Sequence, residues 1–315
     1  VSREAVDFVV RRRPPRATEA LNVYWEFADA RLGMYRERLA SHRVGTIADP
    51  VLATHRFTNT FRATDRVSQY LITNVIYDRS ARAFQDEFAR VLLFKLFNKI
   101  ETWEAIRHHA GDVTARTVLD GSVGDAVAQL AHRGGLYNAA YIMPPPRHLS
   151  GPKALRHVSL LAHLLADGMP DRVEAAGSLG EVFLLLRDVP SFGPFLAFQY
   201  AIDLSYGPTL QHNENQHVVA GPGALRGLRK CFDDFGDFEP HDVIRFTQSR
   251  MPEDLDRLGI DSLNLWGRSP TLIDLQNVFC EVDKYTRVAR PDLSNGVPGS
   301  RIKQRYRPDR RPLSP

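Results

Sequence analysis

The chain has little cysteine, no long apolar run and almost no alternating strand pattern, and each shortage excludes a class of protein. Cys231 and Cys280 are too few for a disulfide framework or a four-cysteine metal cluster, so we expect two reduced thiols. No apolar run approaches the roughly 20 residues that a membrane span requires, so no membrane partner is expected. The N-terminal residues are charged and lack the apolar core of a secretory signal, which predicts a cytoplasmic protein.

Several nucleotide and metal motifs are also missing. The sequence has no G-x-x-x-x-G-K-[ST], the loop that binds ATP phosphates in kinases and ATPases. His212 and His217 are five residues apart and Cys231 has no neighbouring cysteine, so no zinc site is indicated. No cofactor is evident, and the sequence leaves open whether a divalent metal takes part.

The basic character of the chain is concentrated at its two ends. Residues 1–16 contain five arginines against Glu4 and Asp7 (net +3), and residues 301–315 have a net charge of +5. The remaining body therefore carries −4, although the whole chain is at +4. Such ends contact phosphates in many proteins, or they are solubilising and disordered, and both alternatives stay open. We expect a basic N-terminal arm over 1–16, a helical domain over 17–290 and a basic, disordered tail over 291–315.

Helical periodicity dominates the sequence between these ends. Apolar residues recur at three- and four-residue spacing in most segments, and capping signals such as Asp49-Pro50 precede some of them. The expected helices include 21–39, a helix from Pro50, 67–76, 84–97, 155–165, 182–186, 224–232, 243–250 and 272–284. Short strands at 113–119 or 218–220 are only weakly indicated. The fold class that follows is mostly α and multi-helical.

The segment Leu186–Asp203, LRDVPSFGPFLAFQYAID, has the pattern of a helix-hairpin-helix. One helix runs into a turn at Pro190, Phe192 and Gly193, and a second helix follows at once. In such motifs a glycine turn lets backbone N–H groups approach a DNA phosphate, and the helix N-terminus adds partial positive charge. A second loop of this kind contains Gly221 and Gly223. We predict that these five residues contact DNA.

Polar residues stand among apolar helical residues in three blocks, which is costly unless they are paired or used. The first block contains Arg62, Asp65, Arg66 and Gln69 at a spacing that predicts one helical face. The second contains Asn98 and Glu101, and the third contains Gln199 and Asp203. An internal ion-pair network that holds helices in register is the alternative to a reaction site. The aromatic residues near these blocks are expected to be core.

Four motifs in this order resemble one known family. They are R-F-T-N-T-F-R-A-T-D-R-V-S-Q-Y from Arg56, L-F-K-L-F-N-K-I-E-T-W from Leu93, G-P-F-L-A-F-Q-Y-A-I-D-L from Gly193 and V-V-A-G-P-G-A from Val218. The family is the helical domain named after 5-hydroxymethyluracil DNA kinases, which belongs with the α-glutamyl/putrescinyl-thymine pyrophosphorylases of DNA base hypermodification. The resemblance covers roughly residues 20–285 and implies a fold like that of helix-hairpin-helix DNA glycosylases.

The resemblance also implies a reaction and a partner. An amine or amino acid would displace pyrophosphate from the 5-methylene of a 5-pyrophosphorylated hydroxymethyluracil in DNA. Since the P-loop is missing, the kinase that installs the pyrophosphate is expected to be a separate protein. The target base must leave the duplex to be reached.

The residues fit that chemistry in two groups. Asp203 or Glu101 is the expected general base, with Asn98 beside them as a catalytic candidate. The residues expected to bind the substrate or its pyrophosphate are Arg56, Asn59, Arg62, Asp65, Arg66 and Gln199. In helix-hairpin-helix glycosylases the catalytic Asp usually lies farther along the chain from the hairpin than Asp203 does.

Two other functions are compatible with the same residues. A DNA glycosylase that excises a modified pyrimidine would use a similar fold, base flipping and a similar Asp. A non-catalytic DNA-binding module that partners a separate DNA base kinase would need the hairpin but neither carboxylate. Detection of abasic sites, or loss of function confined to hairpin variants, would separate these alternatives.

Overall fold

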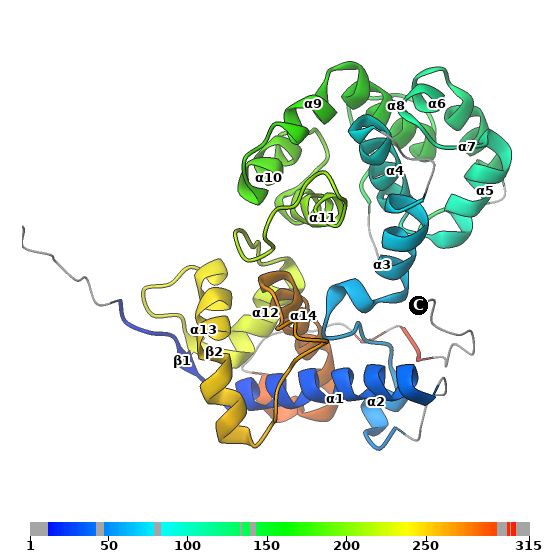
Figure 1. The fold of residues 1–315 in the computed structure, drawn as a ribbon. Helices are drawn as coiled ribbons and strands as arrows, with labels where there is room; N and C mark the ends of the chain where they lie inside the picture. The colour runs from blue at the N-terminus through cyan, green and yellow to red at the C-terminus, as the bar shows by residue number, and fades with distance from the viewer. Residues whose placement is uncertain are drawn as a thin grey trace, which may run out of the picture. The chain divides into compact units, whose positions relative to one another are not determined.

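The computed structural model describes residues 12–41, 47–78, 83–132, 134–138, 143–294, 301–302 and 304–306. These residues form fourteen α-helices and one small two-stranded sheet, so the mostly α, multi-helical prediction is confirmed (Figure 1). Most of the predicted basic arm and tail lies outside the described residues. Within the described ranges, no helix is both long and apolar enough to cross a bilayer.

The described residues divide into two compact units within the range where the sequence suggested one helical domain. Unit 1 contains the residues up to Thr60 and those from Ala220 onward, and unit 2 is the continuous segment Phe61–Val219. Each unit has its own set of packed helices.

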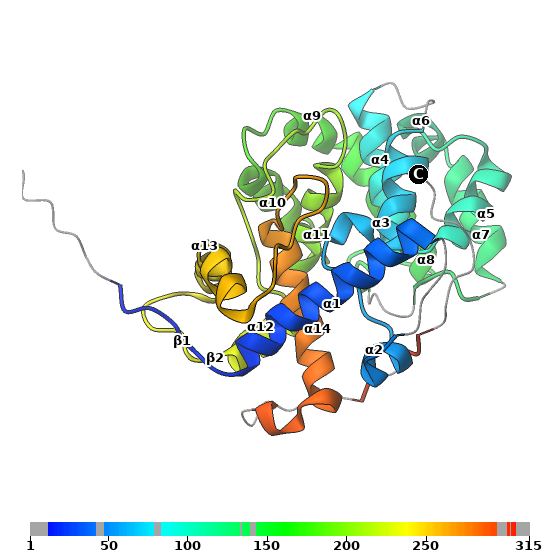
Figure 2. The same cartoon turned by 60° about the horizontal axis from the view of Figure 1, so that its bottom comes forward.

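Unit 1 is built around the long helices α1 and α14, which pack against each other (Figure 2). Trp25 and Phe279 are two of its fully buried aromatic side chains. A short antiparallel pair of strands, β1 and β2, joins the start of this unit to the end of α12. Its elements are β1 (Arg16–Ala17), α1 (Ala20–Ser41), α2 (Pro50–Thr54), α12 (Pro222–Cys231), β2 (Phe232–Asp234), α13 (Pro240–Leu258), α14 (Leu272–Ala289) and the 3-10 helix η3 (Pro291–Ser294).

Two glycines allow α12 to pack closely on α14. A Cβ added to Gly223 would lie 2.3 Å from the Sγ of Cys280, and one added to Gly227 would lie 2.0 Å from the carbonyl oxygen of Phe279. Gly227 requires glycine because the backbone of Phe279 occupies the space that a Cβ needs, whereas a Cβ at Gly223 would require the Cys280 side chain to move. Gly223 therefore faces a neighbouring helix of its own unit.

The chain near residue 305 is paired with the end of α2. Arg56 donates its backbone N–H to Gln304, and Tyr306 donates to Thr54, at 3.1 and 3.0 Å. His55 and Arg305 form the antiparallel bridge between them. The prediction of a disordered tail over 291–315 is therefore wrong for residues 304–306, because backbone hydrogen bonds hold them against unit 1, and for Pro291–Ser294, which form η3.

Unit 2 has the buried helix α4 at its centre, in contact with η2, α5, α6, α8, α9 and α11. Nearly all residues of α4 are buried, as the apolar pattern over 84–97 predicted. The elements are the 3-10 helix η1 (Arg62–Thr64), α3 (Arg66–Tyr70), the π-helix η2 (Leu71–Ile76), α4 (Phe84–Phe97), α5 (Ile100–Ala110), α6 (Ala115–Leu119), α7 (Ser122–Ala131), α8 (Lys153–Ala166), α9 (Met169–Glu174), α10 (Leu179–Arg187) and α11 (Pro194–Leu204).

Arg90 anchors α4 within unit 2. Its fully buried guanidinium donates to the carbonyl of Val75 at 2.8 Å, to Asp78 at 2.9 Å and to Asp112 at 2.7 Å. These bonds tie α4 to the end of η2 and to the loop before α6. The same helix carries Lys95, so Arg90 also fixes the position of Lys95 in the unit.

Three local predictions need correction. The segment 113–119 contains the helix α6, whose capping box at Thr114 and Thr117 starts it, and 218–220 is not paired as a strand. Arg62 and Gln69 do not share one continuous helical face, because Asp65 has an extended backbone (φ −66°, ψ 142°) that separates η1 from α3.

We predict that Gly227→Ala destabilises the protein by about 1–3 kcal/mol, because its methyl group would collide with the backbone of α14. Gly33→Ala is the matched control in α1, where nothing lies within 4 Å of an added Cβ. That control should be neutral or stabilise by about 0.5–1 kcal/mol. Urea unfolding measures both, and equal effects would contradict the close packing.

Candidate functional site

Asp203 lies at the centre of a buried charged cluster in unit 2. It is fully buried in α11, where its Oδ1 accepts a hydrogen bond from Arg62 Nη2 at 2.6 Å. Its Oδ2 forms an ion pair with Lys95 Nζ at 2.9 Å. The three charged side chains come from α11, η1 and α4, and all are buried.

Gln199 and Tyr206 complete this cluster around Arg62. Gln199 lies one helical turn before Asp203, and its Oε1 accepts from Arg62 Nε and Nη2 at 3.3 and 3.1 Å. The Tyr206 hydroxyl accepts from Arg62 Nη1 at 3.0 Å, and Tyr206 is the half-buried member. Gln199 is only 4% exposed, and its Nε2 has no hydrogen-bond partner in the described part of the chain. We call these five residues the Asp203 cluster.

Opposing effects set the charges in this cluster. Burial disfavours charge on Asp203, but Arg62 and Lys95 outweigh it and lower the pKa of the carboxyl below its usual value. Burial likewise opposes charge on Arg62, yet Asp203 and Tyr206 raise its pKa well above the ordinary value. Burial lowers the pKa of Lys95, and the neighbouring Arg62 adds to that effect although Asp203 opposes it. Of the two cations, Lys95 is therefore the one that loses its proton more easily than the free side chain does.

The sequence-predicted site residues fall into both units. Unit 2 contains Asp203, Glu101, Asn98, Arg62, Asp65, Arg66, Gln199, Pro190, Phe192 and Gly193, whereas Arg56, Asn59, Gly221 and Gly223 belong to unit 1. Of the residues in unit 2, the structure brings Arg62, Gln199 and Asp203 into direct contact.

Asn98 and Glu101 have local roles at the junction of α4 and α5. Asn98 closes α4 in the left-handed conformation (φ 48°), a position that asparagine tolerates better than most residues. Glu101 is exposed in the first turn of α5, where an acidic side chain complements the helix dipole. The burial and bonding that mark the Asp203 cluster are not shared by Glu101.

Two predicted pyrophosphate-binding residues of unit 1 also have defined environments. Asn59 accepts a hydrogen bond from Arg31 Nη2 at 2.7 Å through its Oδ1. Arg56 has an exposed side chain in the extended segment that pairs with Gln304.

The α10–α11 hairpin is present, but its turn differs from the glycine-centred one predicted. Ser191 takes the left-handed conformation (φ 80°), whereas Gly193 is the extended N-cap of α11 (φ −74°). Phe192 is buried and stacks on Tyr200 at 4.6 Å between ring centroids, so it supports the turn from inside. Pro190 and Gly193 are exposed. Gly221 starts α12 in the same extended N-cap conformation, again followed by proline.

Sequence reasoning missed Lys95 and Tyr206. Lys95 could have been predicted, because it is a lone cation in the apolar run V-L-L-F-K-L-F. A buried charge of this kind requires a partner, and Asp203 provides it. Tyr206 gave no periodic signal because it lies just beyond the end of α11.

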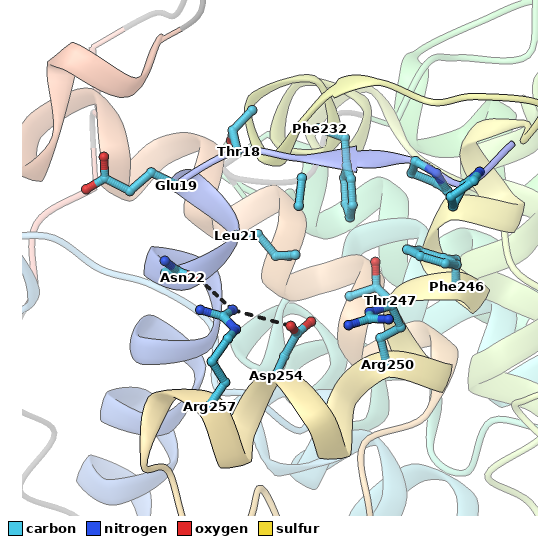
Figure 3. Close-up of a pocket in the computed structure, with 13 residues that line it drawn as sticks. Thr18, Glu19, Leu21, Asn22, Phe232, Phe246, Thr247, Arg250, Asp254 and Arg257 are labelled. Atoms are coloured by element: carbon cyan, nitrogen blue, oxygen red, sulfur yellow. Dashed lines mark hydrogen bonds and ion pairs between the residues drawn. The ribbon is translucent and has the colours of Figure 1, made fainter.

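The described part of unit 1 contains a pocket of about 460 Å³ between β1, α1 and α13 (Figure 3). Its charged groups are satisfied internally, since Arg257 donates to Asn22 and Asp254, and Arg250 pairs with Glu253. No group of three or more His, Cys, Asp or Glu side chains suited to a metal ion occurs in the residues that the structure describes.

Another buried acid of unit 2 is Glu87, which lies on α4. Burial raises the pKa of Glu87 to about 7, although a hydrogen bond from Thr209 opposes the change. A Cβ on Gly207 would lie 1.8 Å from Glu87 Oε1, so the chain just after Tyr206 packs directly on this carboxyl.

We predict that Glu87→Gln becomes increasingly more stable than the parent as pH rises from about 4.5 to about 7. The native state favours protonated Glu87, so it binds more protons than the unfolded state in this window, and the parent loses stability as pH rises. Melting temperatures of both proteins across this range measure the effect. A constant difference would show that Glu87 titrates normally.

Comparison with known proteins connects these features to one family. The family model described as "5-hmdU DNA kinase, helical domain" matches residues 18–295. The 5-hmdU DNA kinase of Bacillus phage SP10 is 25% identical over 259 residues, which cover 75% of this chain and 40% of that relative. The chain thus spans less than half the length of the relative. No solved structure matches it. Since the family match includes most of the chain, the protein belongs to the family of the 5-hmdU DNA kinase helical domain.

Proposed function

We propose that this protein is a DNA base hypermodification enzyme that replaces pyrophosphate on 5-pyrophosphorylated hydroxymethyluracil with an amine or amino acid. Family membership supports the substrate class, since the relative's name refers to 5-hmdU in DNA. The observation that carries the reaction site is the Asp203 cluster, in which Gln199 keeps a buried amide donor with no partner in the described chain. A buried donor without an acceptor costs free energy, and a ligand that accepts a hydrogen bond from it would remove that cost.

The proposed reaction is a displacement at the base methylene. The bond between this carbon and the pyrophosphate oxygen breaks, and a bond from the carbon to the amine nitrogen forms. Pyrophosphate leaves with the electron pair, and the amine loses one proton. Arg62 is always charged and is suited to the negative charge that develops on the leaving group. Gln199 Nε2 is suited to donate to a carbonyl oxygen of the flipped base.

In this proposal Lys95, and not Asp203, is the proton acceptor. The lowered pKa of Asp203 and the ion pairs at both of its oxygens make this carboxylate a weak base. Burial lowers the pKa of Lys95, so its ammonium loses a proton more easily than that of an ordinary lysine. In the deprotonated form the amine would take the proton from the nucleophile, and Asp203 would then stabilise the ammonium. In this proposal Asp203 positions Lys95 and Arg62, and the sequence-predicted role of general base moves to Lys95.

DNA would be held at the α10–α11 hairpin, through its exposed residues Pro190 and Gly193. Backbone N–H groups in the first turn of α11 are available to a phosphate there. We also propose that unit 2 binds DNA in the way that helix-hairpin-helix glycosylases do. The pyrophosphate would come from a separate kinase that acts on 5-hydroxymethyluracil. Such a kinase needs a P-loop, and residues 1–315 do not contain this motif.

A base-excision glycosylase is the second candidate function, and Lys95 is the observation that favours it. A lysine that is desolvated beside another cation is an activated nucleophile, and Lys95 lies beside Arg62. Attack by the deprotonated amine on C1′ of the sugar would break the N-glycosidic bond and release the base, and water would then hydrolyse the imine between lysine and sugar. The product would be an abasic site instead of a modified nucleoside. A non-catalytic DNA-binding module would form neither product.

We predict that Lys95→Met and Gln199→Leu each lower product formation by about 10²-fold or more, because they remove the proton acceptor and the base contact. Lys153→Met is the matched control, since it removes a lysine of unit 2 that makes a cation–π contact with Tyr137 and is not a member of the cluster. Each variant is incubated with duplex DNA containing 5-hydroxymethyluracil, a kinase for that base, ATP and an amine. Nucleosides are then analysed by mass spectrometry.

Folding and duplex binding are measured for every variant, so that loss of product is separated from loss of structure. Lys95→Met leaves Asp203 paired with Arg62, whereas Asp203→Asn would leave two buried cations without a carboxylate and is expected to unfold more easily. Wild-type turnover by the Lys95→Met variant would refute the role of Lys95. Abasic sites from the parent protein would indicate the glycosylase instead.

A further inference from the structure

Unit 1 contains a second pocket, of about 500 Å³, whose lining is rich in arginine. Arg287 comes from the last turns of α14, His55 from the end of α2, and Arg301 and Arg305 from the segment beyond η3. The backbone pairing of 304–306 with 54–56 brings these residues together. Among the described residues that line the pocket, none is a carboxylate.

The arginines of this pocket have unequal environments. Arg287 is bonded to Asp283, a fully buried carboxylate that also pairs with Arg226 and Lys230. Asp283 therefore holds Arg287 in place while it is shared among three cations. Arg301 and Arg305 are exposed and form no ion pair within the described residues.

His55 adds a second feature that points to a ligand. Its Nδ1 is buried and has no hydrogen-bond partner in the described part of the chain. A neutral imidazole can present this nitrogen as a donor, and a protonated one always does. The pocket in Figure 3 is different, because Arg250 and Arg257 there are paired with acidic side chains.

We propose that the pocket formed by His55, Arg287, Arg301 and Arg305 binds phosphate groups of the DNA backbone. Arginine presents a fork of N–H donors that matches phosphate oxygens, and unpaired exposed arginines gain most from such a contact. The site contacts the polymer and takes no part in the reaction at the Asp203 cluster. The choice of DNA as the source of phosphate rests on the proposed function, since free pyrophosphate has the same oxyanion chemistry.

The test compares the double variant Arg301→Gln/Arg305→Gln with the parent in binding to a short unmodified DNA duplex at several salt concentrations. Both side chains are exposed, so the variant should fold normally, which circular dichroism checks. Each arginine that neutralises a phosphate adds about 1 to the slope of log K against log salt. We expect a slope shallower by about 2 and an affinity at least about tenfold lower at low salt.

Arg229→Gln is the matched control, because it removes an exposed arginine of unit 1 that lies on α12 outside the pocket. It should change the slope much less than the double variant does. His55→Ala should weaken duplex binding in the same direction as the double variant.

Inorganic pyrophosphate serves as the second probe, measured by calorimetry. If the double variant binds the duplex as the parent does but loses pyrophosphate binding, the pocket takes a free anion and the DNA assignment is wrong. If neither probe distinguishes the variant from the parent, the site itself is refuted. The binding assay contains no reaction. If the parent protein forms no product but the double variant still binds DNA with the shallower salt dependence, the proposed function is refuted and this site is not.

Discussion

The ion pairs of Asp203 are the constraint on which the interior of unit 2 depends. Removing three charged groups from water costs several kcal/mol for each ion, and the cost is offset only when the geometry and hydrogen bonding are good. Asp203 meets that requirement with Arg62 at 2.6 Å and Lys95 at 2.9 Å. Because these residues come from three elements, the pairing also fixes η1, α4 and α11 against one another.

Stability alone is a weak reason for such a cluster. Apolar residues of similar volume usually stabilise a core at least as well as a buried ion pair does. The cluster also leaves the Gln199 amide without a partner in the described chain, which costs further free energy. Buried polar groups that lower stability and lack a hydrogen-bond partner are typical of a reaction site, where a bound ligand supplies the missing partner. Asp283 has a comparable position in unit 1, where this buried carboxylate holds Arg287 at the pocket that His55, Arg301 and Arg305 also line.

The sequence predicted most of the longer helices because they have an amphipathic or wholly apolar pattern, but α5 and α7 were not among the expected ones. The buried run over 84–97 and the N-cap at Asp49 are confirmed. The segment at 113–119 was harder to predict, since its seven residues include β-branched ones and are too few to distinguish a short helix from a strand. Residues 304–306 are held by backbone hydrogen bonds to a segment far away in the sequence. Such bonds require no particular side chains, so no sequence pattern predicts them.

Three members of the Asp203 cluster were predicted to be important for similar reasons, and whether they form a reaction site stays a prediction. Arg62, Gln199 and Asp203 stood out because polar residues interrupt apolar helices, and the structure joins all three. The lone charge of Lys95 in an apolar helix carried the same signal, but the polar residues after it drew the interpretation to Asn98 and Glu101. Gly223 was predicted to contact DNA, but it lies where α12 packs on α14. The sequence alone does not distinguish a glycine at a helix contact from one at a ligand.

The most direct measurement is a crystal structure of the protein bound to an oligonucleotide that contains 5-hydroxymethyluracil. The account predicts that the modified base leaves the helix, that one of its carbonyl oxygens accepts from Gln199 Nε2, and that its 5-substituent lies beside Arg62 and Lys95. A base that stays stacked, or that binds away from Asp203, would contradict the assignment of this cluster as the reaction site.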